Sequence, residues 1–394
     1  MELVKLGKIC DLKNGFAFKS KDYIETSNTL SCRMSSIRPG GSFDLHHNKK
    51  YLPDSFALTY SDYLLNDGDI VIAMTDLAGD PKILGVPTIV NTEGNNLLQN
   101  QRVGKLIIKN KEKIFTPYLQ YALNRPENKN YYKKFAGGGL QINVGKKEIL
   151  NNKIPLPPLA EQQRIAGILD EADQLRQLNK QLITKYEQLS QSLFLEMFGD
   201  PVTNPKGWEK VEMNKLCDFS KTSIKPENIK PNTKYIPLDA IQKETGNIID
   251  YEMVSKKDVK SNKFYFNNKH ILYGKLRPYL NKVALPLQEG ICSTDIIPIQ
   301  PLEEKTNRYF ISKIMKNKGF VDFANERSSG ANLPRISPKE VEKYKCINPP
   351  IQLQTQFAAR VQLIEQQKQQ AQEALQKSDN LFNALLQKAF KGGL

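Results

Sequence analysis

The sequence predicts an α+β protein in which two similar domains are separated by two long helices. Each domain is expected to hold a mainly antiparallel, curled sheet with short helices. The long helices are expected to form an antiparallel coiled coil, with pseudo-twofold symmetry. Three observations lead to this fold: two stretches have coiled-coil spacing, the whole pattern occurs twice, and the remaining segments are short alternating strands between Gly, Asn and Pro turns.

Two long stretches have the apolar spacing of coiled-coil helices. After the Pro pair at 157–158 the chain runs to Phe198 without another Pro, and a second such stretch follows the Pro pair at 349–350. Steps of three, four and seven residues predict the first seam over Ile168, Ala172, Leu175, Leu182, Tyr186, Leu189 and Leu193. They predict the second over Phe357, Val361, Ile364, Ala371, Leu375, Phe382, Leu385 and Ala389. Neither helix can bury its stripe alone, so we expect each to pack against the other, with polar Asn179, Lys368 and Ser378 fixing the register.

The chain repeats itself in outline. PPLAEQQRIA at 157–166 matches PPIQLQTQFA at 349–358, and Cys10 and Cys217 occupy matching places in LGKICDL and MNKLCDF. The matched segments keep their order, while the loops between them differ in length, as expected where loops select the ligand. The predicted organisation is a first domain, a first helix, a linker with a second domain, and a second helix, at 1–154, 155–199, 200–348 and 349–394.

Charge points to a polyanionic partner. The 394 residues carry a formal net charge of +15, with a pI of about 9.3. A basic protein of this kind commonly binds nucleic acid, although a merely Lys-rich proteome is the alternative. The N-terminus lacks a signal-like apolar run, and no stretch approaches the roughly 20 apolar residues of a membrane span. We therefore expect a cytoplasmic protein with no membrane partner.

No pattern of catalytic or metal-binding residues is recognisable. The histidines are the adjacent His46 and His47 and the distant His270, and none of the five cysteines belongs to a CxxC pair. Cys10 and Cys217 are expected to fill a small buried apolar site used in both halves, and no disulfide is expected. Gly137–Gly139 is interpreted as a flexible loop rather than a phosphate cradle, because no helix start follows it. Asn348–Ile351 resembles the tetrapeptide of amino-methyltransferases but lacks its aromatic residue, so we interpret it as a helix start. We predict no catalytic residue, no metal site and no cofactor bound by this chain.

Basic residues in predicted loops are the candidates for DNA contact. Arginine suits the reading of guanine edges, because its planar fork matches two acceptors in the major groove, whereas lysine suits phosphate. A single Lys pair is usually solvated surface; recurrence in both halves favours binding for the set. The candidates are Arg33, Arg38, Lys49, Lys50, Arg102, Lys133, Lys134, Lys146, Lys275, Arg277, Arg327 and Arg335.

The order of these blocks resembles one known family. The segments IPLPPLAEQQRIAGILDEAD, MFGDPVTNPKGWEKV, LYGKLRPYLNK and STDIIPI, together with the alternation of block and helix, are similar to the specificity (S) subunit of type I restriction-modification systems, the HsdS family. The resemblance covers the whole chain. It implies two target-recognition domains, about 1–154 and 208–348, each reading half of a split site in double-stranded DNA.

The resemblance also implies partners. Two methylation subunits would carry S-adenosylmethionine chemistry on adenine N6, and restriction subunits would supply ATP-driven translocation and cleavage, so S-adenosylmethionine, ATP and Mg²⁺ are expected on those subunits. The Gln-rich helix surfaces are consistent with a protein interface. The expected contact residues are Gln162, Gln163, Ile165, Gln354 and Phe357. The second helix reads PPIQLQTQ rather than the family's PPL-x-EQ, so the contact is better supported for the first.

Two other function classes compete with a non-catalytic specificity subunit. A stand-alone DNA methyltransferase or nuclease would need a cofactor loop or paired carboxylates, which the sequence does not contain in recognisable form. A coiled-coil scaffold that binds only proteins would differ from a DNA reader in its response to salt. The target bases lie in divergent loops and are not predictable from the sequence.

Overall fold

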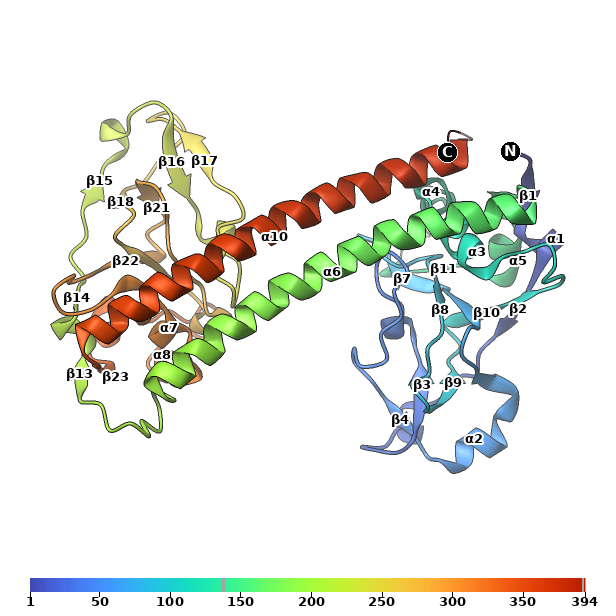
Figure 1. The fold of residues 1–394 in the computed structure, drawn as a ribbon, viewed down its shortest axis with the longest axis horizontal. Coiled ribbons are helices and arrows are strands. Elements are labelled where there is room, and N and C mark those ends of the chain that lie inside the picture. The colour runs from blue at the N-terminus through green and yellow to red at the C-terminus, as the bar shows by residue number, and fades with distance from the viewer. Residues whose placement is uncertain (136–138, 392, 394) are drawn as a thin grey trace. The chain divides into compact units, whose positions relative to one another are not determined.

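The computed structural model describes residues 1–135, 139–391 and 393, and it divides into two compact units. Unit 1 comprises Met1–Leu178 and Ala374–Leu394, and unit 2 comprises Asn179–Glu373. Each unit therefore contains a sheet-rich block and one half of each long helix, α6 (Leu159–Phe198) and α10 (Ile351–Lys391) (Figure 1). Two residues of the glycine run at 137–139 lie outside the described residues.

Unit 1 is built on two small sheets. In its described part, an antiparallel sheet has the order β2 (Cys10–Asn14), β10 (Val103–Ile108), β6 (Ile70–Ala73), β8 (Pro87–Ile89). A second sheet has the order β4 (Tyr51–Leu52), β3 (Thr29–Cys32), β9 (Asn96–Gln99), β5 (Leu64–Leu65), in which β3 and β9 are parallel. Two further pairs are β1 (Leu3–Lys5) with β12 (Lys153–Pro155), and β7 (Thr75–Leu77) with β11 (Gln141–Asn143). The short helices are α1 (Leu6–Ile9), α2 (Ser55–Thr59), α3 (Thr116–Leu123), α4 (Pro126–Lys133) and α5 (Lys146–Asn151).

Unit 2 repeats this plan. One sheet has the order β14 (Cys217–Asp218), β22 (Ile296–Pro301), β19 (Ile271–Gly274), β20 (Val283–Ala284). The other has the order β15 (Ser223–Ile224), β18 (Lys263–Phe266), β21 (Gly290–Cys292), β16 (Thr233–Ile236), β17 (Glu252–Val254), and its β16 and β21 are parallel. A further pair joins β13 (Lys210–Glu212) to β23 (Lys345–Ile347), and the short helices are α7 (Arg308–Lys316), α8 (Lys318–Glu326) and α9 (Pro338–Glu342).

Hydrogen bonding confirms that the two units are copies of one design. The parallel pair ends in unit 1 with Asn100 N donating to Cys32 O, and in unit 2 with Ser293 N donating to Ile236 O, at 3.0 and 3.1 Å. The predicted α+β class, with mainly antiparallel sheets in two similar blocks and two long paired helices, is thereby confirmed. Cys10 and Cys217 occupy matched buried places, and burial raises the pKa of both thiols.

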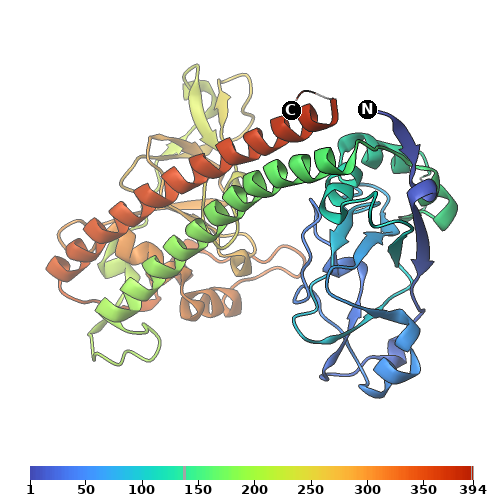
Figure 2. The ribbon, with the colours of Figure 1, turned by 45° about the vertical axis from the view of Figure 1, so that its right-hand side comes forward.

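The long helices pack in opposite directions in both units (Figures 1 and 2). In unit 1, Arg176 of α6 bonds Asp379 of α10 at 2.7 Å. In unit 2, Lys368 of α10 bonds Glu187 of α6 at 3.1 Å. Lys368 is only 5% exposed, as expected for a polar residue that fixes register in a helix seam. The two ion pairs occupy matching positions in the repeat.

The predicted seam is right for α10 and partly wrong for α6. In α10, Phe357, Val361, Ala371 and Ala389 are buried, and the other predicted seam residues are half-buried. In α6, by contrast, Leu175, Leu182 and Leu189 are 45%, 39% and 51% exposed. The buried row lies instead over Ile165, Leu169, Ala172, Ser190, Phe194 and Phe198. The helix carries two apolar rows, and the row that packs is the one interrupted by polar and charged residues.

Among the described residues, the structure contains no helix with both the length and the apolar content needed to cross a membrane.

Candidate nucleic-acid interface

Three segments of unit 2 that are far apart in sequence meet at one place. They contain Lys275, Asp295 and Arg335. Lys275 N donates to Asp295 O at 2.9 Å, and Ile336 N donates to Lys275 O at 3.1 Å. Beside them, Leu276 and Arg335 form an isolated antiparallel bridge. Main-chain hydrogen bonds therefore hold Lys275, Asp295 and Arg335 in fixed positions. We call this arrangement the strand crossing of unit 2.

A hollow of about 410 Å³ opens at this crossing, and three of the predicted DNA-contacting residues line it. Two of them, Lys275 and Arg335, belong to the crossing, and the third, Arg327, comes from the end of α8. The lining residues are Lys275, Arg327, Ser329, Arg335, Ile336, Ser337, Pro338 and Glu340. The fold thus gathers cations that the sequence places up to 60 positions apart.

Carboxylates hold two of these arginines in place. Arg335 Nε donates to Asp295 Oδ1 at 3.0 Å and Arg335 Nη2 donates to Asp295 Oδ2 at 3.3 Å. This pairing raises the pKa of Arg335, which therefore stays charged. Arg327 lies 3.8 Å from a carboxylate oxygen of Glu340, and its guanidinium lies 4.0 Å from the centre of the Phe323 ring. An arginine whose fork is oriented before binding loses less conformational freedom when it contacts a ligand.

Unit 1 contains the same crossing with different side chains. Met74 N donates to Arg102 O at 3.0 Å, and Val144 N donates to Met74 O at 2.9 Å. Thr75 pairs with Asn143 in β7 and β11, and the Thr75 hydroxyl donates to Asn143 Oδ1 at 2.7 Å. The matched positions are therefore Met74 with Lys275, Arg102 with Asp295, and Asn143 with Arg335.

Both units thus have the same strand crossing, but with different basic side chains. This arrangement can be compared with known proteins. Residues 1–188 match the family model described as the type I restriction modification DNA specificity domain. The chain is 29% identical over 194 residues to the specificity subunit of the type I restriction enzyme EcoDI from Escherichia coli, covering 48% of this chain and 43% of that protein. The first 188 residues of the chain are thus similar to type I restriction-modification specificity subunits.

Two further comparisons fit this specificity-subunit family. The specificity subunit of the enzyme MjaVIII from Methanocaldococcus jannaschii is 30% identical over 181 residues, covering 45% of this chain and 41% of that protein. The solved S subunit from M. genitalium shares the fold, with a TM-score of 0.59 at 15% identity, over 99% of this chain and 96% of that chain. The aligned region spans less than half the length of these two curated relatives.

The remaining predicted DNA contacts are dispersed over the units of this specificity-subunit homologue. Arg33 lies 5.9 Å from the centre of the Tyr23 ring, and the neighbouring Met34 has its sulfur 4.0 Å from Arg102 Nη1. Arg38 lies in a turn in which its N–H donates to Ser42 O at 2.9 Å. In unit 2, Arg277 has a left-handed backbone with a φ of 51° and its N–H donates to Pro334 O, beside the crossing.

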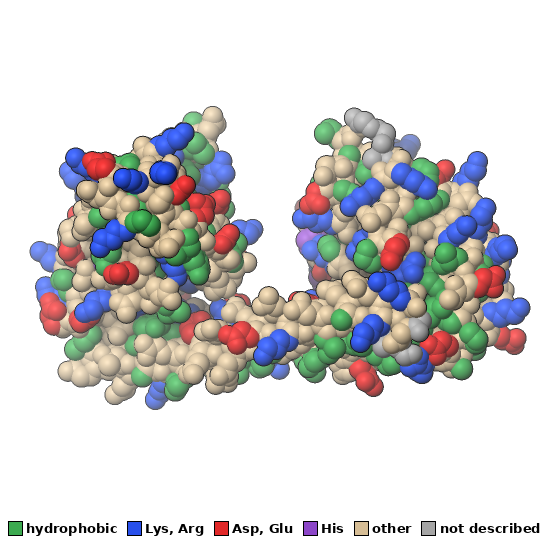
Figure 3. All heavy atoms as spheres, turned by 90° about the horizontal axis from the view of Figure 1, so that it is seen from above, with side chains coloured by type: hydrophobic (Ala, Val, Ile, Leu, Met, Phe, Trp, Pro, Cys, Tyr) green, Lys and Arg blue, Asp and Glu red, His purple; other side chains and the backbone are tan. Residues whose placement is uncertain are grey.

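The predicted lysines of unit 1 are exposed, and none of them lines the hollow of unit 2. Lys49 and Lys50 are next to β4, and Lys49 lies 5.3 Å from the centre of the Tyr51 ring. Lys133 and Lys134 end α4, with Lys134 lying 4.0 Å from the centre of the Tyr131 ring. Lys146 bonds Asp11 at 2.7 Å and lowers the pKa of that carboxyl group. On the face shown in Figure 3, basic side chains are interspersed with acidic ones instead of forming one patch.

The predicted partner-contact residues at the helix starts are mostly buried inside the chain. Gln162 Oε1 accepts from Phe115 N at 2.9 Å, and Gln162 Nε2 donates to Lys113 O and Pro157 O, both at 2.9 Å. Gln354 does the same in unit 2, accepting from Thr306 Oγ1 at 2.8 Å and from Asn307 N at 3.0 Å.

Four of these five side chains are buried within their own domains. Gln162, Ile165, Gln354 and Phe357 are each 0% exposed, and Gln163 alone of the five is exposed. The buried glutamines satisfy main-chain groups where each long helix begins, so they lock the helix starts onto their own domains. A partner can reach the Gln163 side chain but not the other four in this conformation.

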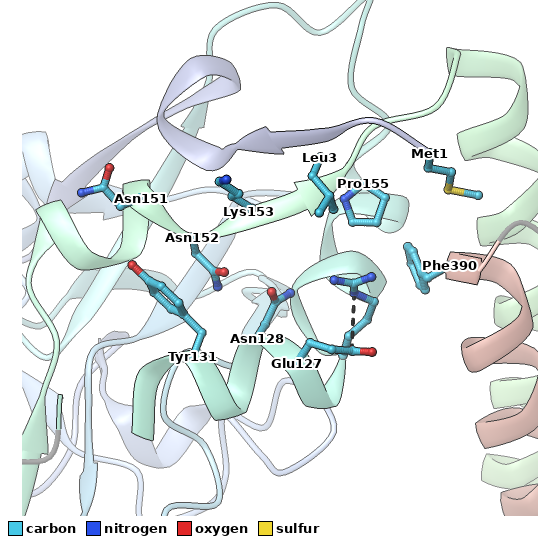
Figure 4. Close-up of a pocket in the computed structure, with 11 residues that line it drawn as sticks. Met1, Leu3, Glu127, Asn128, Tyr131, Asn151, Asn152, Lys153, Pro155 and Phe390 are labelled. Carbon is cyan, nitrogen blue, oxygen red and sulfur yellow. Dashed lines mark ion pairs between the residues drawn. The ribbon is translucent and has the colours of Figure 1, made fainter. Parts of the chain in front are cut away.

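A second hollow, in unit 1, contains none of the predicted site residues. It measures about 540 Å³ and lies between the start of α4, the β1–β12 pair and Phe390 near the end of α10 (Figure 4). The Arg125 guanidinium lies 5.1 Å from the centre of the Phe390 ring and 3.9 Å from a carboxylate oxygen of Glu127. These contacts join the end of α10 to the domain, and we assign them a structural role.

Sequence reasoning missed Asp295, the carboxylate that orients Arg335. A signal was present, because Asp295 lies in the STDIIPI segment and the matching segment of the first half contains Arg102. The strand register, however, is needed to show that Asp295 and Arg102 occupy equivalent positions in the two units.

Proposed function

We propose that this chain is the DNA-specificity subunit of a type I restriction-modification complex and has no catalytic chemistry of its own. Unit 1 and unit 2 would each read one half of an asymmetric, two-part site in double-stranded DNA. The chain would then position the subunits that modify and cut the DNA.

One observation carries the proposal: the same strand crossing occurs in both units with different side chains. A repeated scaffold supports two similar modes of docking on DNA. Unequal residues at the matched positions support unequal half-sites, because base edges are read by the side chains that contact them. The net charge of +15 supports the polyanionic ligand.

The similarity of residues 1–188 to the specificity-subunit family supports the choice of partners. The complex would contain two methylation subunits, which bind S-adenosylmethionine and methylate adenine N6, and restriction subunits, which use ATP and Mg²⁺. We assign these cofactors to the partner subunits and no residue of this chain to them. Gln163 on α6 would be one point of contact with a methylation subunit.

The response of DNA binding to salt tests this proposal. With at least six phosphate contacts, the affinity of the full chain for random-sequence duplex DNA should fall by roughly a thousandfold between 50 and 200 mM salt, because bound counterions are released on binding. Fluorescence anisotropy of labelled duplexes measures this fall, with the chain alone and assembled with its methylation subunits. Absence of binding in both preparations would favour a protein-binding scaffold, and methyl transfer from labelled S-adenosylmethionine by the chain alone would favour an enzyme.

A further inference from the structure

The two strand crossings offer different arginines from matched positions of one scaffold. In unit 1 the arginine is Arg102, just before β10. In unit 2 the position of Arg102 is occupied by Asp295, and the arginine is Arg335, at the position of Asn143. The arginine therefore comes from one segment of the crossing in unit 1 and from a different segment in unit 2.

We propose that Arg102 and Arg335 are the guanine-reading residues of their respective half-sites, and that Asp295 is a positioning residue for Arg335. This inference rests on the proposed function and adds to it the residues that determine specificity. Guanine presents two acceptors in the major groove, and the guanidinium fork is the side-chain group that matches both.

The geometry leaves the Arg335 fork available. Its Nε and one Nη2 proton are directed at Asp295, and its Nη1 has a weak contact of 3.4 Å with Leu333 O. The outward Nη1–Nη2 edge therefore retains N–H groups for a ligand, and the side chain is 42% exposed. The next residue, Ile336, is fully buried and holds the segment that carries Arg335 against the core of unit 2.

Arg102 is arranged differently and should respond differently. Its side chain is exposed, and its contact with Met34 is a 4.0 Å approach of Nη1 to a thioether sulfur, which is a weak acceptor. Met74 beneath it is buried. No carboxylate in the described part of the chain gives Arg102 the bidentate support that Asp295 gives Arg335, so the orientation of Arg102 depends more on the DNA.

Selection of DNA from a random duplex library by the full chain, assembled with its methylation subunits, tests these roles. Arg335→Lys should lower the preference for guanine at one or two positions of one half-site by about tenfold or more, because lysine keeps the charge but lacks the fork. Arg102→Lys should do the same in the other half-site only. The salt dependence of binding should stay unchanged in both variants, since the charge is kept.

The variant Asp295→Asn tests whether Asp295 acts by positioning the Arg335 side chain or only through its own negative charge. It removes the carboxylate that orients Arg335, so discrimination in that half-site should fall while affinity for unrelated DNA holds or rises. Asp322→Asn is the matched control, because it removes a carboxylate whose ion pair with Lys318 lies within α8 of the same unit. This control should leave base preferences as they are.

The outcomes distinguish failure of the proposed function from failure of the residue assignments. If the wild-type chain selects no two-part sequence, the proposed function fails. If it selects one and both lysine variants select the same sequence, the proposed function stands and the assignment of Arg102 and Arg335 is overturned. A parallel loss of affinity for all DNA by Asp295→Asn would overturn its role as a positioning residue.

Discussion

Replacing Phe357 with Ala should lower the free energy of unfolding of unit 2 by about 3–5 kcal/mol. The side chain is fully buried near the start of α10, and its ring centre lies 5.6 Å from that of Phe194 and 5.3 Å from that of Phe198, both on α6. Removing the ring leaves a cavity where both long helices meet the core of unit 2. Urea denaturation of the full chain, followed by circular dichroism, measures the loss.

Leu363→Ala is the matched control for this prediction. Leu363 lies on the same helix and is 64% exposed, so truncating it should change the free energy of unfolding by no more than about 0.5 kcal/mol. If Phe357→Ala were no more destabilising than Leu363→Ala, the start of α10 would not be anchored in the domain as described.

Inserting four residues into each long helix should lengthen the spacer of the DNA site by about one or two base pairs. The insertions belong after Leu178 in α6 and after Glu373 in α10, where the two units divide. Four residues are about one turn and add about 6 Å, against about 3.4 Å for each base-pair step. The Arg176–Asp379 and Glu187–Lys368 ion pairs lie on opposite sides of the insertions and each keeps its own register.

Selection from a duplex library measures the spacer and both half-sites together. The half-sites should stay unchanged, because neither crossing is altered. The same four residues placed in the linker at 200–207 provide the control and should leave the spacer as it is. A spacer that does not respond to the paired insertions would contradict the view that the helices set the separation.

The two long helices were predictable because the spacing of their apolar residues can be read from the sequence alone, before the residues that pack against them are known. The choice of face was not predictable for α6. Leu175, Leu182 and Leu189 form a clean heptad row, whereas the packed row contains charged Arg176 and Glu187, whose partners lie on the other helix. The α10 seam was correct because its apolar residues fall in a single row.

The candidate site was only partly predictable for a related reason. Loop position and residue type were enough to select Arg102, Lys275, Arg327 and Arg335 as candidates. Which cations converge depends on strand register, and that is set by main-chain pairings such as Leu276 with Arg335. For the same reason Gln162 looked like a surface residue, since the main-chain groups that it satisfies lie in another segment.

Mapping methylated adenines in the host chromosome, with and without this chain, tests whether the chain directs methylation to a two-part DNA site. We expect methylation in one asymmetric sequence of two parts with a fixed spacer, and we expect every such site to lose its methyl group when the chain is absent. A methylation pattern that is the same without the chain, or that follows a single uninterrupted sequence, would contradict this expectation.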